Sequence, residues 1–242
     1  RLRILESFRY MADWQTRSIH RFRDFLLDSG AFTFMHRGLG KTNPDDYVMR
    51  YARYVRDNDV EKFFEFDIDK ISDLETVNGY RDRIERYVGR RCIPVWHVQR
   101  GVSEWLRLCD EYDYVAIGDL GGRETRAMYN DIPSLIDKAH DRGAIVHGLG
   151  CGGATKLQRF PFDTVDSASW IWGLKRSFLF MWDGERMRYE GFDRKELEVS
   201  LDDVQLHNFM EWVAMSTDLE FGRGASSRLL GQHRVLTIDE SL

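Results

Sequence analysis

The sequence predicts an α/β protein, a single (β/α)8 barrel of the TIM type with a C-terminal helical extension. The chain has 242 residues, a length that suits one barrel domain. Its short apolar runs alternate with helical stretches, which implies a parallel sheet. There are eight such runs, and eight strands close a barrel, while an open doubly wound sheet is the structural alternative.

The eight runs have the length of strands and are bounded by Gly, Asp or Asn. They are Ile4–Phe8, Phe25–Phe32, Phe63–Ile68, Cys92–Val98, Tyr114–Ile117, Ala144–Leu149, Thr164–Ala168 and Ser177–Trp182. The first and the last have the weakest pattern. We expect each run to form one strand of the barrel.

Helix signals fill the segments between these runs. Asn43 before Pro44 predicts an N-cap and a first helical residue, for a helix to about Arg56. The capping box Ser72-Asp73-Leu74-Glu75 predicts a helix to about Val88. Helical spacing also covers Ser103–Glu111, Pro133–Arg142 with Gly143 as its C-cap, and Leu201–Ser216.

No repeat, low-complexity block or linker divides the chain, so we expect residues 1–242 to form one domain. The barrel core is expected over about residues 1–190 and the extension over about residues 191–242. The last part, Gly222–Leu242, contains Gly, Ser and Arg and is expected to be loose or packed over the barrel.

The formal net charge is -5, so the molecule as a whole does not attract phosphate, and a nucleic-acid partner needs a local basic patch. The candidate sets are Arg1, Arg3, Arg9, Arg17, Arg21 and Arg23, and Arg81, Arg83, Arg86, Arg90 and Arg91. The alternative is that both sets form solvated faces.

The three cysteines, Cys92, Cys109 and Cys151, lack metal-ligand spacing, and their odd number favours a reducing compartment. No apolar run reaches the roughly 20 residues of a membrane span, and no signal peptide is visible. We therefore expect a cytoplasmic protein without a membrane partner.

Acidic residues end three of the expected strands. In a barrel, the residues at the carboxyl ends of the strands face the active site. Asp28, Asp67 and Asp166 each follow apolar residues, so each is expected to be partly buried. A buried carboxylate is costly unless it has a partner or a task. One such aspartate alone is better explained as a helix cap, but three at one rim favour a catalytic site.

A glycine-rich turn follows the sixth run. At Gly148, Gly150, Gly152 and Gly153 the backbone can approach a ligand closely, and its N–H groups are candidates to hold a phosphate or a base edge. The spacing is not that of a dinucleotide-binding loop, and a tight turn is the alternative. We interpret Cys151 in this turn as a small apolar filler rather than a nucleophile.

Two histidines, His97 and His147, end strands and are candidates to meet. The sequence has no His-x-His, His-Glu-x-x-His or Cys-x-x-Cys motif, so we expect no metal site. Ser29 and Ser167 lie outside any Gly-x-Ser-x-Gly elbow, which disfavours a hydrolase triad.

Five segments in register carry a resemblance to a known family. They are Leu27-Asp28-Ser29-Gly30-Ala31-Phe32, Phe66-Asp67, Val98-Gln99-Arg100-Gly101, Ala116-Ile117-Gly118-Asp119-Leu120 and Phe162-Asp163-Thr164-Val165-Asp166. In their order and spacing they resemble the tRNA-guanine transglycosylase family. The resemblance implies a (β/α)8 barrel that exchanges guanine in a nucleic acid for a 7-deazaguanine base.

The resemblance also implies roles for the matching residues. Asp166 matches the nucleophilic aspartate, and Asp28 matches the aspartate at the base, with a role in proton transfer or recognition. The predicted substrate-binding residues are Ser29, Asp67, Gln99, Gly118, Asp119, His147 and Gly148.

Within this set, Asp67 and Gln99 match the residues that read the edge of the base. Gly118 and Asp119 match its backbone contacts, although the family usually has a second glycine where Asp119 stands.

Two family features are absent from the chain. Ser167-Ala168-Ser169-Trp170 stands where Pro-Thr-Arg usually follows the nucleophile, and the zinc site of three Cys and one His is missing. Both features belong to the part of the family that engages tRNA. The resemblance is therefore closer to the divergent branch that modifies DNA with 7-deazaguanines such as preQ0.

Base exchange needs the residues that this chain offers. Cleavage of an N-glycosidic bond creates positive charge on the sugar, which a carboxylate at C1′ traps covalently. A second acid, on the order of 5 Å from the first, protonates the departing base and deprotonates the incoming one, without a cofactor. A base inside a duplex must be flipped out, and Phe32, Trp96 and Trp170 are candidates to stack on it.

Three alternatives stay open. The first is the same exchange on tRNA. The second is a barrel lyase or hydrolase of small phosphorylated compounds, in which the glycine turn binds phosphate and the carboxylates act as acid and base or bind Mg²⁺. The third is a non-catalytic, nucleic-acid-binding member of the family. A partner subunit or a homo-oligomer is compatible with each of them.

Overall fold

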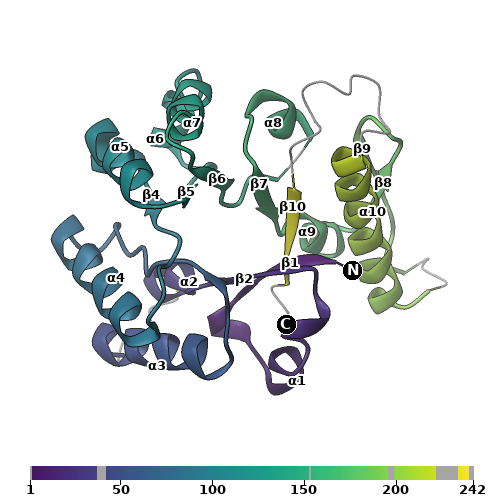
Figure 1. Ribbon diagram of the computed structural model, residues 1–242. Coiled ribbons are helices and arrows are strands. Elements are labelled where there is room, and N and C mark those ends of the chain that lie inside the picture. The colour runs from purple at the N-terminus through teal and green to yellow at the C-terminus, as the bar shows by residue number, and fades with distance from the viewer. Residues whose placement is uncertain (1, 37–41, 153, 196–198, 222–233, 240–242) are drawn as a thin grey trace.

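The computed structural model describes residues 2–36, 42–152, 154–195, 199–221 and 234–239. These residues contain a parallel sheet of eight strands in the order β3-β2-β1-β10-β7-β6-β5-β4, with helices around it (Figure 1). The strands of the sheet are β1 (Arg3–Ser7), β2 (Asp24–Asp28), β3 (Lys62–Phe63), β4 (Val95–Trp96), β5 (Tyr114–Ile117), β6 (Ile145–Gly148), β7 (Thr164–Ser167) and β10 (Arg234–Asp239).

The helices follow the strands along the chain, as an α/β fold requires. The α-helices are α1 (Asp13–Thr16), α2 (Ala31–His36), α3 (Pro44–Asp57), α4 (Leu74–Val88), α5 (Gly101–Glu111), α6 (Arg123–Ala127), α7 (Ile132–His140), α8 (Ala154–Arg159), α9 (Ser169–Arg176) and α10 (Leu201–Phe221). Short 3-10 helices are η1 (Phe8–Tyr10), η2 (Ile19–Arg21) and η3 (Val98–Arg100).

The helix-start signals are confirmed at α3 and α4. The side chain of Asn43 accepts a hydrogen bond from the Asp45 N–H, and Pro44 is the first helical residue. Asp73, rather than Ser72, caps α4 by accepting from the Thr76 N–H. The capping signal therefore located the helix, while the capping residue is one position later than the Ser-x-x-Glu pattern predicts.

The predicted eighth strand is wrong. Phe178–Trp182 forms β8, which pairs antiparallel with β9 (Met187–Gly191) in a separate two-stranded sheet. Gly184 in the turn between them has φ +93°. The signal for this hairpin is the dipeptide Asp183-Gly184 between two apolar runs, since Asp-Gly favours the tight turn of a hairpin.

The eighth strand of the main sheet is instead β10, which lies between β1 and β7. Leu236 is in register with Asp166 on β7, and Thr237 with Ile4 on β1. This strand belongs to Gly222–Leu242, the segment expected to be loose or packed over the barrel; residues 222–233 and 240–242 are outside the described part. The C-terminal extension thus supplies the predicted helix, α10, and also a strand of the core sheet.

The two ends of the strand order, β3 and β4, are joined by an isolated parallel bridge between Phe64 and Ile93. The Ile93 N–H donates to the Phe63 carbonyl at 2.8 Å, and the Glu65 N–H donates to the Ile93 carbonyl at 3.0 Å. Backbone hydrogen bonds therefore connect the sheet across its two outermost strands.

Three apolar cores hold these elements together. One packs α5, α7, α9 and α10 on β5–β7, with Trp105 and Phe162 among its fully buried side chains. The second packs α2, α3 and α4 on β2 and β3, and the third contains Leu5, Leu26 and Val95 from β1, β2 and β4. Among the described residues, no helix has the length and apolar character that a membrane span needs.

Candidate active site

Three aspartates lie close together at the carboxyl ends of the strands. Asp28 ends β2, Asp67 follows β3, and Asp166 lies near the end of β7. The charges of Asp67 and Asp166 both raise the pKa of Asp28, so the three carboxyls are within electrostatic range of one another. The structure thus brings together the three acids that the sequence placed at one rim.

Asp28 holds its proton more tightly than an ordinary aspartate. Burial in the surrounding protein and the nearby Asp67 raise its pKa from 3.8 to about 7, although the Gly30 N–H donates to its carboxylate at 2.9 Å. The side chain is only partly covered from solvent. Asp28 can therefore give up and regain a proton near neutral pH.

Asp166 is held through one oxygen only. Its Oδ1 accepts from the Gly150 N–H at 2.7 Å and lies 3.1 Å from Nε2 of His147. Its Oδ2 is buried and has no hydrogen-bond partner among the described residues. Because hydrogen bonds fix the carboxylate while one oxygen stays uncommitted, Asp166 has the arrangement of a nucleophile.

His147, on the neighbouring strand β6, contacts both Asp166 and Thr164 of β7. It is fully buried, its Nδ1 lies 2.7 Å from Thr164 Oγ1, and its ring packs on Phe64 at 5.2 Å. Both ring nitrogens are thus engaged by β7, which fixes the orientation of the imidazole. His147 supports Asp166, and no described contact joins it to His97.

The glycine turn packs against the strand beside it. A side chain at Gly148 would overlap the ring of Phe162, at 2.7 Å from the nearest ring carbon. Gly150, at φ +68°, directs its N–H to Asp166. Gly153 lies outside the described residues. The backbone of this turn therefore contacts the candidate nucleophile directly.

Cys151, in the same turn, is fully buried, and burial raises the pKa of its thiol to about 12. A thiol with this pKa stays neutral near pH 7, and the thiolate is the nucleophilic form. The position agrees with the interpretation of Cys151 as an apolar filler.

A second acid and histidine pair follows strands β3 and β4. His97 Nε2 lies 2.9 Å from Asp67 Oδ2 and 3.7 Å from Asp69 Oδ2. Burial opposes charge on the imidazole, but the hydrogen bond and charge of Asp67 outweigh it and raise the pKa of His97. Burial also raises the pKa of Asp67, against the effect of His97. Because both pKa values are raised, the Asp67–His97 pair holds a proton more tightly than the two groups would in water.

Gly118 makes room for this pair. A side chain there would come within 2.7 Å of His97 Cε1, so only glycine lets the imidazole lie against β5. In this structure, the absence of a side chain at Gly118 allows the His97 imidazole to lie close to the backbone there. A backbone contact to a base stays a prediction.

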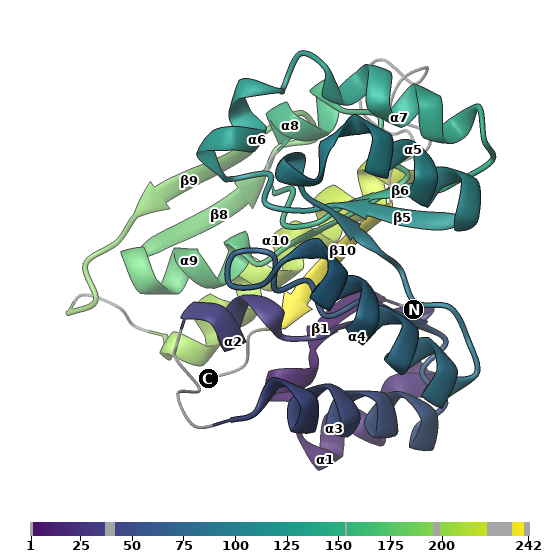
Figure 2. The ribbon, with the colours of Figure 1, turned by 90° about the vertical axis from the view of Figure 1, so that its left-hand side faces the viewer.

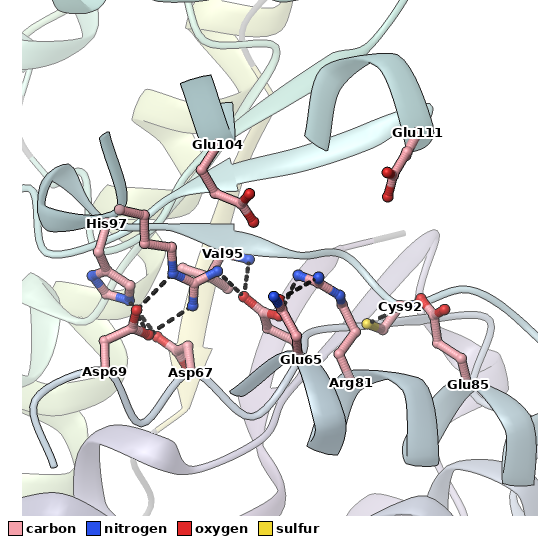
Figure 3. A network of polar contacts seen from close by, with 12 residues as sticks. Glu65, Asp67, Asp69, Arg81, Glu85, Cys92, Val95, His97, Glu104 and Glu111 are labelled. Atoms are coloured by element: carbon pink, nitrogen blue, oxygen red, sulfur yellow. Dashed lines mark hydrogen bonds and ion pairs between the residues drawn. The ribbon is translucent and has the colours of Figure 1, made fainter. Parts of the chain in front are cut away.

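A buried ion network fixes the position of the Asp67–His97 pair (Figure 3). Glu65 is fully buried and accepts from the Val95 N–H at 2.8 Å, from Arg100 at 2.9 Å and from Arg81 at 3.0 Å. Arg100 also donates two hydrogen bonds to Asp69, at 2.6 and 2.7 Å. Charged groups buried in this way are stable because each has a partner.

Sequence reasoning missed this network. Arg81, assigned to a basic patch or solvated face, is only 3% exposed. The signal was its place on the buried stripe of α4 with Val77 and Ile84, at spacings of four and three residues. Arg3, in the other basic set, is also buried and pairs with Asp24, while Arg1 lies outside the described residues.

The remaining predicted residues make other contacts in the structure. Ser29 is buried in the turn into α2, where its Oγ accepts from the Ala31 N–H at 3.4 Å. Gln99 is exposed on η3. Asp119, at φ +53°, is exposed beside Lys70, 3.4 Å away. Each follows or ends a strand at the same edge as the acids, and their contacts to a base stay predictions.

Two of the candidate stacking residues belong to the apolar core. Trp96 is 1% exposed and donates to the Gly101 carbonyl, and Trp170 is 5% exposed against Phe209. Neither presents a free face to a base in this structure. Phe32, by contrast, lies exposed on α2.

Among the described residues, no group of three or more His, Cys, Asp or Glu has an arrangement that could hold a metal ion. The fold and the site define an α/β protein with a cluster of carboxyls at the carboxyl edge of a parallel sheet. Carboxyls are among the groups that enzymes use for proton transfer and nucleophilic attack, so the cluster is a candidate active site.

Comparisons with known proteins leave the particular activity open. No family model matches the sequence, and no curated protein matches it. A solved structure described as a xylose isomerase domain protein from Planctomyces limnophilus is similar over 99% of this chain and 91% of its own, at 12% identity and a TM-score of 0.31. A similarity at that level carries no argument about function.

Proposed function

We propose that this chain is a base-exchange transglycosylase that replaces guanine in DNA with a 7-deazaguanine base such as preQ0. The observation that carries the proposal is a pair of carboxyls in opposite settings at the ends of β2 and β7. The pKa of Asp28 is raised to about 7, which suits an acid and base. Asp166 has one anchored and one uncommitted oxygen, which suits a nucleophile.

We infer further that the eight-stranded sheet is a closed (β/α)8 barrel. The Phe64–Ile93 bridge joins the two outermost strands, which an open sheet leaves apart. Leu26 on β2 and Val95 on β4 belong to one buried core, although six positions separate their strands in the sheet order. Their membership of one cluster is explained if the sheet curls round on itself, and Asp28 and Asp166 then face one interior mouth.

In the first half of the reaction, Asp166 Oδ2 attacks C1′ of the target nucleotide and forms a C1′–O bond. The bond from C1′ to N9 of guanine breaks, and its electron pair goes to N9. Asp28 gives its proton to the departing base. The products are free guanine, an ionised Asp28 and a sugar esterified to Asp166.

In the second half, the ionised Asp28 takes the proton from N9 of the incoming 7-deazaguanine. N9 then attacks C1′, and the ester bond to Asp166 breaks with return of its electron pair to the carboxylate. Two inversions restore the original configuration at C1′, and Asp28 is again protonated.

The base lies, in this proposal, between the two catalytic acids and the Asp67–His97 pair. Asp67 accepts from the donor edge of the base while His97 holds its carboxylate in place. Gln99 and Asp119 follow the neighbouring strands β4 and β5 and are proposed as further contacts at the mouth.

Access to the nucleophile requires a local movement. Asp166 is fully buried, so a sugar reaches Oδ2 only after a neighbouring segment shifts. The glycine turn is that segment in our proposal, because Gly150 bonds directly to Asp166 and glycine adopts new backbone angles easily.

The choice of DNA rather than tRNA, a cytoplasmic location and a possible homo-oligomer or partner subunit remain predictions from the sequence. The choice of polymer is tested together with the reaction itself, by supplying both polymers to the same enzyme.

The test is incorporation of labelled 7-deazaguanine into duplex DNA and into tRNA. We expect wild type to label DNA and Asp166→Asn to label neither polymer, because the amide cannot form the ester. Asp110→Asn makes the same chemical change at a side chain that is 63% exposed, and we expect it to exchange at the wild-type rate. Intact-mass analysis of wild type trapped with DNA is expected to find one covalent adduct.

Exchange by Asp166→Asn at the wild-type rate would show that the nucleophile is assigned wrongly. Label in tRNA alone would move the chain to the tRNA branch. No label in either polymer would reject base exchange; Mg²⁺-dependent turnover of a small phosphorylated compound would then favour a lyase or hydrolase, and nucleic-acid binding alone would favour a non-catalytic member.

A further inference from the structure

Helix α9 carries an exposed aromatic ring flanked by two cations. Trp172 is 50% exposed, with Lys175 Nζ 4.9 Å and Arg176 Cζ 5.4 Å from the centroid of its ring. We call these three residues the α9 cluster. The α9 cluster therefore presents an aromatic face with two positive charges close to it at the surface.

The charges of the α9 cluster are unmatched within the part of the chain that the structure describes. Lys175 and Arg176 form no ion pair with an acid among those residues. By contrast, Arg56 on α3, Arg83 on α4 and Arg90, just after α4, each lie within 3.1 Å of an aspartate. Two adjacent, unpaired positive charges in a protein of net charge -5 are complementary to an anionic partner.

The α9 cluster lies beside the candidate active site. Helix α9 begins at Ser169, whose N–H donates to Ser167 at the end of β7. A side chain at Gly152, in the glycine turn, would come within 2.8 Å of Ser169 Oγ. Figure 2 shows α9, α2 and the β8–β9 hairpin on one side of the molecule. Trp172 is about 4.5 Å along the helix from Ser169.

We propose that the α9 cluster holds the nucleic-acid strand next to the target nucleotide. Trp172 stacks on a base beside the one that is extruded, and Lys175 and Arg176 neutralise adjacent phosphates. An extruded nucleotide leaves its neighbour unstacked, and an aromatic face restores that stacking for any base. The inference rests on the proposed function in one respect, that the substrate is a polynucleotide.

The chemistry of the α9 cluster fits a strand better than a small anion. A free phosphate needs only the cations, whereas an exposed indole between them adds a surface for a base. DNA and RNA offer the same base and phosphate groups, so the two polymers form separate arms of the test.

The experiment is fluorescence anisotropy of labelled single-stranded DNA and RNA of about 12 nucleotides, titrated with the full chain at two salt concentrations. We expect Trp172→Ala to weaken binding on the order of tenfold. Arg176→Glu is expected to weaken binding at least as much and to lower the salt dependence by about one phosphate contact. Arg56→Glu is the matched control, because Arg56 also stacks on a ring, Tyr87, at 4.3 Å.

Equal affinity of wild type, Trp172→Ala and Arg176→Glu, or an equal loss in Arg56→Glu, would overturn the proposal, as would no binding of either polymer by wild type. Binding that depends on α9 without base exchange would keep this surface and reject the proposed reaction. Exchange that needs Asp166 but is unchanged in both α9 variants would keep the reaction and reject the surface. Circular dichroism checks that each variant is folded.

Discussion

Asp28 and Asp166 are the same residue type at equivalent ends of two strands, yet their surroundings make them chemically different. Asp28 lies near two other acids, and burial with Asp67 raises its pKa to about 7. Asp166 Oδ1 accepts a hydrogen bond from the Gly150 N–H, while its Oδ2 is buried with no hydrogen-bond partner among the described residues. Two carboxyls can act as a proton donor and as a nucleophile in one site only if their environments differ in this way.

The raised pKa of Asp28 gives a pH dependence with a definite sign. In the proposed reaction, release of guanine needs protonated Asp28, and the protonated fraction falls tenfold for each pH unit above about 7. Single-turnover release of labelled guanine is therefore expected to slow by that factor at alkaline pH. Asp28→Asn, which has no proton to give, should lose about 100- to 10,000-fold in rate and the alkaline fall with it.

The Asp110→Asn variant serves as the control for this measurement and should keep the wild-type pH profile. A profile of Asp28→Asn that still falls above pH 7 would assign the titration to another group, for which the Asp67–His97 pair is the nearest candidate.

At the scale of the elements, the Glu65 network joins three segments that local sequence leaves independent. Glu65 follows β3, Arg81 lies on α4 and Arg100 ends η3. Asp69 accepts a hydrogen bond from Arg100 and lies beside His97. The network therefore links α4 and η3 to the Asp67–His97 pair and helps to fix where that pair lies. The arrangement therefore depends on partners that are far apart in the sequence.

Removal of Arg100 should therefore destabilise the fold strongly. Arg100→Met leaves Glu65 and Asp69 buried with fewer partners, and we expect a loss of about 3–5 kcal/mol in the free energy of unfolding by urea. Arg107→Met is the matched control, since Arg107 also binds two acids, Glu104 and Glu111, but at a side chain that is 38% exposed. There we expect a loss of at most about 1 kcal/mol.

A similar loss in both variants would mean that burial does not set the strength of the Arg100 contacts. The activity of each variant, measured under conditions where it is folded, separates an effect on stability from one on the position of Asp67.

The sequence predicted those elements that local chemistry defines. Asn43 and Pro44 begin α3 as predicted, because a cap and a proline act within one turn of the helix. The three acids were found because strand ends share one edge of a parallel sheet. Arg81 and Arg100 were missed as site-supporting residues because their partners are 16 and 35 residues away, on Glu65.

The error at the eighth strand has a different cause. Phe178–Trp182 and Arg234–Asp239 both have the length of a strand, but the first is apolar throughout whereas the second mixes apolar and polar residues. Only the second takes the place beside β7 in the main sheet. The antiparallel partner β9 follows the first run directly, so its pairing costs little chain entropy. The place beside β7 in the main sheet is occupied by β10, which pairs with β1 and β7. This pairing joins segments far apart in the sequence, so local sequence patterns do not reveal it.

At the scale of the whole molecule, the position of β10 connects the beginning of the chain to its end. It lies between β1 and β7, so contacts between the first and last strands complete the sheet. Such contacts have the greatest separation in sequence that this chain allows, and they form only after a large loop closes. The candidate nucleophile lies on β7, next to β10, where Asp166 is in register with Leu236.

A proline in β10 tests whether this strand holds the molecule together. Leu236→Pro removes a backbone N–H from a strand with neighbours on both sides, and we expect a loss of about 3 kcal/mol or more in stability to urea. Tyr189→Pro, on β9 of the two-stranded hairpin, is the matched control and should cost about 1 kcal/mol, the value of one hydrogen bond. Because Asp166 depends on β7, Leu236→Pro should also reduce base exchange at temperatures where it remains folded. Unfolding midpoints that are equal for Leu236→Pro and wild type would place β10 outside the cooperative sheet, and the strands β1 and β7 would then have to be stabilised without it.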